Sequence, residues 1–202
     1  MDEAAIILLA MRLLVPLIIL RFPLTGVLLS ALVDVNDSAF LGSDVDYQQL
    51  DKLLDTYYLS LAALTALRWK DGLARRIALG AYAWRSFGVA LVFLTDQRWL
   101  LMVFPNFFEP LFVFYLLYVY LSKKDRLFTS GWVVAIVAAV LLIPKIVQEY
   151  LLHIYLPAPD TTPVWAVYLV DHFAWAALPL YVIPPLAVLV VCVLRAKKAA
   201  RL

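Results

Sequence analysis

The sequence predicts an all-helical integral membrane protein that crosses the bilayer several times. Of its 202 residues, 65% are hydrophobic and 16% are charged, whereas soluble domains average roughly 45–50% and about 25%. A soluble domain of this length could not bury so much apolar surface. This apolar composition excludes a nucleic-acid-binding protein, and the single cysteine excludes a disulfide scaffold.

Runs of apolar residues give the number of helices, because a hydrocarbon core about 30 Å thick needs roughly 20 of them per crossing. The runs predict one domain, residues 1–202, containing a bundle of about six transmembrane helices. Their approximate spans are 13–35, 53–68, 77–95, 99–121, 130–156 and 164–194.

The N-terminal run has two interpretations. Residues 4–33 are apolar apart from two arginines, which we expect to extend to the interface. One continuous helix over 13–35 is favoured, because a turn at Arg21-Phe22-Pro23 would be very tight and would leave few groups to satisfy the backbone. The alternative is a hairpin of two short spans, which would make seven helices.

The later runs are defined by how few polar residues interrupt them. The span 53–68 is short and extends if the acids before it are helical, and 77–95 is interrupted only by Arg85. The other three carry the following polar or kinking residues: Asn106 and Glu109 in 99–121; Lys145, Glu149 and His153 in 130–156; Asp171, His172 and the Pro184-Pro185 pair in 164–194.

The basic residues predict the orientation. Connections 68–76 and 122–126 and the tail after 194 hold 11 of the 17 lysines and arginines, whereas the intervening connections hold Lys52 and Arg98. Because short cytoplasmic loops are enriched in lysine and arginine, these basic segments and the C-terminus are predicted to face the cytoplasm. With six helices the N-terminus faces the cytoplasm too.

The acidic residues gather at the opposite, non-cytoplasmic side. Asp34 and Asp37 are three residues apart, and Asp51 and Asp55 are four apart, so each pair shares a helix face. We expect the two pairs to converge where one helix ends and the next begins. Clustered carboxylates repel, so they bind a cation, hold protons or pair with bases, and the candidate bases are Lys52, Arg21 and Arg85. A solvated acidic loop that caps two helices is the alternative.

Further candidates come from later helices. Glu149 and His153 are four residues apart near the outer end of their span, and we expect one of them to act as general base. Arg85 lies near the middle of its span and is expected to pair with an acid or hold an anionic group. The ligand set suits a divalent metal such as magnesium, manganese or zinc.

The acidic segment resembles the CDP-alcohol phosphotransferase signature. Asp34-Val-Asn-Asp37 followed by Asp51-Lys-Leu-Leu-Asp55 is similar to that family's four metal-binding aspartates. The segment departs from the family at Ser38, where a glycine is expected, in the shorter spacing before Asp51, and in its predicted position outside the cytoplasm. The resemblance covers this segment only, implies divalent metals and phosphate-bearing lipids, and assigns no family.

Together these features predict metal-dependent hydrolysis or transfer on a lipid or lipid-linked substrate. The alternatives are an ion-coupled transporter of small solutes and a non-catalytic subunit of a membrane complex. The expected partners are membrane lipids and no nucleic acid, with a homo-oligomer or a complex partner left open.

Overall fold

The computed structural model describes residues 3–41, 45–97, 99–150 and 182–199, and their regular secondary structure is entirely helical. The prediction of an all-helical fold is confirmed for these residues. The elements are α1 (Glu3–Leu14), the 3₁₀ helix η1 (Val15–Leu20), α2 (Pro23–Leu41), α3 (Val45–Ala66), α4 (Gly72–Thr95), α5 (Leu100–Val103), α6 (Phe108–Ser122), α7 (Gly131–Tyr150) and a helix over 182–198.

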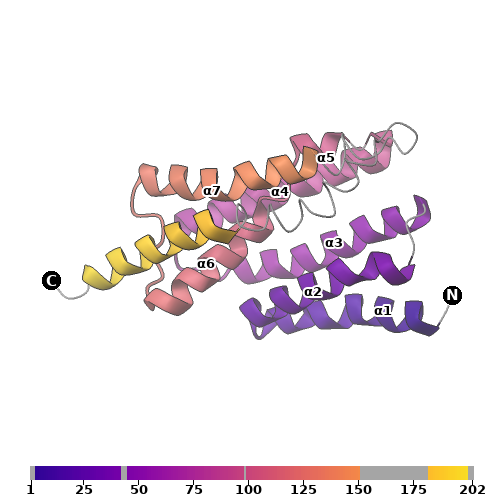
Figure 1. The fold of residues 1–202 in the computed structure, drawn as a ribbon, viewed down its shortest axis with the longest axis horizontal. Helices are drawn as coiled ribbons and strands as arrows, with labels where there is room; N and C mark the ends of the chain where they lie inside the picture. The colour runs from indigo at the N-terminus through magenta and orange to yellow at the C-terminus, as the bar shows by residue number, and fades with distance from the viewer. Residues whose placement is uncertain (1–2, 42–44, 98, 151–181, 200–202) are drawn as a thin grey trace.

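The long helices lie side by side as an elongated bundle, and successive ones run in opposite directions (Figure 1). Helix α6 supplies the centre of the core, because Phe108, Leu111 and Phe112 are fully buried. Trp69, in the α3–α4 connection, stacks on Tyr115 of α6 with the ring centroids 3.9 Å apart. Aromatic stacking of this kind adds about 0.5–1.5 kcal/mol to the burial of apolar area.

The N-terminal region is a hairpin, so the prediction of one continuous helix over 13–35 is wrong. The amides of Arg21 and Phe22 both donate to the carbonyl oxygen of Ile18, at 3.1 and 2.7 Å, and close the tight turn. Gly26 then lets α2 lie against η1, since a Cβ at that position would be 2.4 Å from the backbone nitrogen of Ile19. These bonds satisfy backbone groups of the turn, for which the sequence interpretation expected too few hydrogen-bond partners.

A single side chain fastens the two basic connections to each other. Asp71 caps α4 by accepting from the amides of Leu73 and Ala74 at 3.0 and 3.1 Å. Its second oxygen accepts from the amides of Leu127 and Phe128 at 2.9 and 3.2 Å. The α3–α4 and α6–α7 connections therefore meet at one end of the bundle.

The last turns of helix 182–198 lie at this same basic end, whereas α1 begins at the opposite end (Figure 1). For six helices, both termini are expected on the same side. With the N-terminal hairpin, the start of α1 and the end of helix 182–198 instead lie at opposite ends of the bundle. The hairpin adds one more pass along the bundle and moves the start of the chain to the other end.

Two helical segments in the described part of the chain are long and apolar enough to cross a membrane by length and composition. They are Gly72–Thr95 and Leu100–Ser122, with mean hydropathies of 1.6 and 1.8, and they match the predicted spans 77–95 and 99–121. Ile6–Leu20, Pro23–Asp34 and Gly131–Val147 are apolar but shorter. Most of the predicted span 164–194 lies outside the described residues.

Candidate charged site

Three aspartates and one arginine from three different helices meet inside the bundle. The guanidinium of Arg12 on α1 contacts the carboxylate of Asp34 on α2. Its Nη2 also donates to Oδ1 of Asp51 at 3.0 Å and to Oδ1 of Asp55 at 3.4 Å, both on α3. Arg12 is only 4% exposed, so it is the buried centre of this group.

Lys52 supplies a second cation to the same carboxylates. Its Nζ lies 2.6 Å from Oδ2 of Asp51 and 3.8 Å from Oδ2 of Asp55. We call these five residues, Arg12, Asp34, Asp51, Lys52 and Asp55, the Arg12 cluster. Three carboxylates facing two cations give it a formal charge of −1.

The carboxylates are also close enough to one another to share a metal ion. One oxygen each from Asp34, Asp51 and Asp55 lies within 4.8 Å of the others. Oxygen ligands from carboxylates are those that magnesium and calcium prefer, and manganese accepts them too. The convergence of the two acidic segments, predicted from their spacing, is therefore observed for these three residues.

The cluster lies deeper in the bundle than the sequence predicted. Asp34 precedes the last residue of α2 by seven positions, and Asp51 and Asp55 follow the first residue of α3 by six and ten. At 1.5 Å per residue these offsets correspond to roughly 9–15 Å along the helices. The aspartates are therefore not at helix ends, where they could act as solvated caps.

Of the remaining predicted site residues, the structure describes the side chain of Arg85 and not those of the others. Asp37 and Glu149 lie on α2 and α7, but their side chains are outside the described part, as is His153 with Asp171 and His172. Arg85 is 6% exposed and donates through Nη1 to the carbonyl oxygen of Phe104 at 2.9 Å. Because Phe104 precedes Pro105, this bond supports the α5–α6 connection.

Sequence reasoning missed Arg12, which it assigned to the interface. The available signal was its position in an otherwise apolar run that contains two prolines. Once that run folds as a hairpin, Arg12 is enclosed between α2 and α3 and needs an acid, since burial of an unpaired charge is costly.

A second polar group adjoins the Arg12 cluster. Tyr58, on α3, is 4% exposed and lies close enough to the carboxylate of Glu109 to interact with it electrostatically. Oε2 of Glu109 accepts from Nδ2 of Asn106 at 2.8 Å, and the Glu109 amide donates to Oδ1 of Asn106 at 3.3 Å. This reciprocal pair resembles a capping box and stabilises the start of α6.

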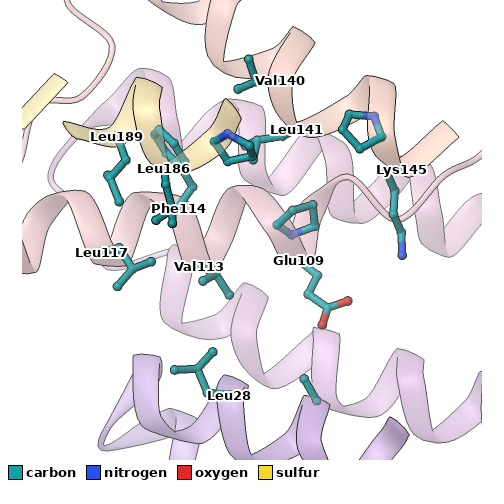
Figure 2. A pocket seen from close by; sticks show the side chains of 14 residues that line it. Leu28, Glu109, Val113, Phe114, Leu117, Val140, Leu141, Lys145, Leu186 and Leu189 are labelled. Carbon is teal, nitrogen blue, oxygen red and sulfur yellow. The ribbon is translucent and has the colours of Figure 1, made fainter. Parts of the chain in front are cut away.

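A cavity of about 380 Å³ opens between α2, α6, α7 and helix 182–198. Twelve of its fourteen lining residues are apolar, and the other two are Glu109 and Lys145. Figure 2 shows these two charged side chains toward one end of the cavity, with Leu117 and Leu189 toward the other. A much smaller void of about 10 Å³, lined by Arg12 and Tyr58 among others, lies on the cluster side.

Comparisons with family models, with curated proteins and with solved structures found no match to this chain. The described residues define a helical bundle that has two helices suited to a membrane by length and composition and a partly buried group of charged side chains.

Proposed function

We propose that this chain is a multi-pass membrane protein in which α4 and the segment Leu100–Ser122, which contains α5 and α6, are two of the spans. Only 22% of the most apolar 18-residue window of α4 is buried, and Phe87 and Leu94 on this helix are 57% and 82% exposed. A core helix of a soluble bundle would bury such side chains, whereas lipid accepts them.

The N-terminal hairpin fits the same environment. Helix α1 with η1 comprises 12 and 6 residues, which corresponds to roughly 30 Å at 1.5 and 2.0 Å per residue. That length matches the hydrocarbon core. In this topology the basic end of the bundle faces the cytoplasm, and the chain starts on the other side.

We further propose that the protein carries out metal-dependent hydrolysis or transfer on a phosphate-bearing lipid. The observation that supports this proposal is the convergence of Asp34, Asp51 and Asp55 beside two cations. The three carboxylates would hold a divalent ion, and this ion would act as a Lewis acid that polarises a phosphoryl oxygen. Arg12 and Lys52, displaced from the carboxylates they contact, would then bind the phosphate through charge-assisted hydrogen bonds.

A structural role is the second candidate, and one observation favours it. Each of the three carboxylates already contacts a cation, so the Arg12 cluster is nearly neutral without a metal. In that case the cluster fastens the N-terminal hairpin to α3 and binds nothing.

Metal analysis of the purified full chain separates the two functions. Protein in detergent is equilibrated with Mg²⁺, Mn²⁺ or Zn²⁺, desalted and analysed by inductively coupled plasma mass spectrometry, with calorimetric titration to detect a weakly held ion. Asp51→Asn/Asp55→Asn is compared with Asp125→Asn, a matched change at an exposed aspartate that pairs with Lys70.

We expect about one ion per chain in the wild type and in Asp125→Asn, and none in the double variant, because carboxamides are poor replacements for anionic ligands. If the folded wild-type chain takes up no ion even in the titration, the metal-dependent function is wrong and the structural role stands.

A further inference from the structure

The cavity between α2, α6, α7 and helix 182–198 has a polar end and an apolar end. Glu109 is the second residue of α6, and Leu117 lies eight residues further on, or roughly 12 Å along the helix axis. Lys145 is in the last two turns of α7, which runs antiparallel to α6 and so reaches the same end as Glu109 (Figure 2). The charges are thus separated from the apolar end along the axis.

The polar end connects to the Arg12 cluster through one side chain. Tyr58 lies close enough to Glu109, which lines the cavity, to interact with its carboxylate electrostatically. Tyr58 also lines the small void beside Arg12. On α2 the cavity-lining Ala31 and the cluster residue Asp34 are three residues apart and share a face. A ligand with its polar group at Glu109 and Lys145 therefore has that group close to the carboxylates.

The size and lining of the cavity define what it would hold. A volume of about 380 Å³ lies within the roughly 300–1,000 Å³ range of small-molecule sites. The twelve apolar lining residues suit a hydrocarbon chain. The oppositely charged Glu109 and Lys145 at one end suit a polar group that carries both a positive and a negative charge, or an anionic group next to a hydroxyl. A phospholipid combines these features, with its phosphate toward Lys145.

We infer that this cavity binds one hydrocarbon chain of a phospholipid and directs the phosphate-bearing end toward the Arg12 cluster. This inference rests on the proposed function, because it names the class of substrate that the cluster would act on. The charged groups of the cluster would bind the phosphate, and the apolar cavity would make the site selective for a lipid.

Photocrosslinking tests the inference on the full chain. The protein is reconstituted into phospholipid nanodiscs containing a phosphatidylcholine with a diazirine in one acyl chain, irradiated and digested, and the labelled residues are located by mass spectrometry. We expect labelling concentrated on the cavity-lining residues of α6 and α7.

Two substitutions fill the cavity from opposite walls, and a third is their control. Val113→Trp on α6 and Ala31→Phe on α2 place bulk in the cavity, whereas Ile143→Trp adds the same bulk on α7 at a side chain that is 61% exposed. We expect both filling variants to lose cavity labelling and the control to retain it. Circular dichroism and size-exclusion chromatography identify any variant that does not fold, and either filling variant alone suffices.

Metal content measured on the same samples keeps the two proposals separate. Loss of labelling with metal retained supports the cavity inference. Labelling spread evenly over exposed apolar residues, and unchanged in both filling variants, overturns the cavity inference even where metal binding persists. Labelling of the cavity in a chain that binds no metal supports the lipid site and overturns only the metal-dependent function.

Discussion

Removing the guanidinium of Arg12 is the sharpest test of the charged site. In Arg12→Ala the carboxylates of Asp34, Asp51 and Asp55 would face one another, and Lys52 would be the counterion that remains among the described residues. Each carboxylate–guanidinium pair at about 4 Å is worth about 4 kcal/mol at an effective dielectric constant near 20. Part of that loss is recovered, because Arg12 itself no longer has to be desolvated.

The net destabilisation follows from the burial of the partners. Breaking a buried ion pair by removing one member costs about 3–5 kcal/mol. Arg12 is 4% exposed, but the three aspartates are 20–34% exposed, so water screens part of the repulsion. We therefore expect the free energy of unfolding of Arg12→Ala to fall by about 3 kcal/mol, the lower end of that range.

The assay is equilibrium unfolding in mixed micelles of increasing SDS content, followed by far-UV circular dichroism. Arg21→Ala is the matched control, because Arg21 is exposed at the hairpin turn and its described side-chain contact is with the ring of Phe22. If Arg12→Ala and Arg21→Ala unfold at the same SDS fraction, Arg12 does not hold the cluster together.

Three further substitutions test the packing of the bundle by the same unfolding assay. Asp71→Ala should lower the free energy of unfolding by about 3 kcal/mol. It removes a helix cap worth about 1 kcal/mol and leaves the buried amide of Leu127 without its acceptor. A loss smaller than about 1 kcal/mol, the value of an ordinary cap, would refute the cross-link between the two connections. Gly88→Ala should cost about 1–3 kcal/mol, since its new Cβ would lie 2.2 Å from Cβ of Phe104. Gly80→Ala on the same helix meets no atom within 4 Å and should stabilise by up to about 1 kcal/mol, so equal effects at the two glycines would contradict the described packing of α4 on the α5–α6 connection.

The helical class and the approximate positions of α4, α6 and α7 follow from the sequence alone. Hydrophobic run length is a local property, and the polar breaks at 68–71 and 122–130 separate the runs wherever the helices finally pack. The common location of the basic connections also follows, because alternating helices return the chain to the same end. Asp71 then adds the contacts that fasten those connections together.

The path of the first 41 residues depends on tertiary structure. Pro16 and Pro23 mark positions where a helix can break, but a kinked span and a hairpin use the same prolines. The hairpin is selected by the packing of α2 on η1, which Gly26 permits by having no side chain at the contact with Ile19. No local pattern contains that contact.

The composition of the charged site was decided in the same way. The spacing of Asp51 and Asp55 puts them on one face of a helix whatever the fold, so their proximity could be predicted. Their pairing with Arg12, 39 and 43 residues earlier, could not, because it exists only after the hairpin brings α1 beside α3. The sequence determined which carboxylates gather, and the tertiary structure determined which cation they enclose and how deeply, since only packing excludes the water that would otherwise solvate them.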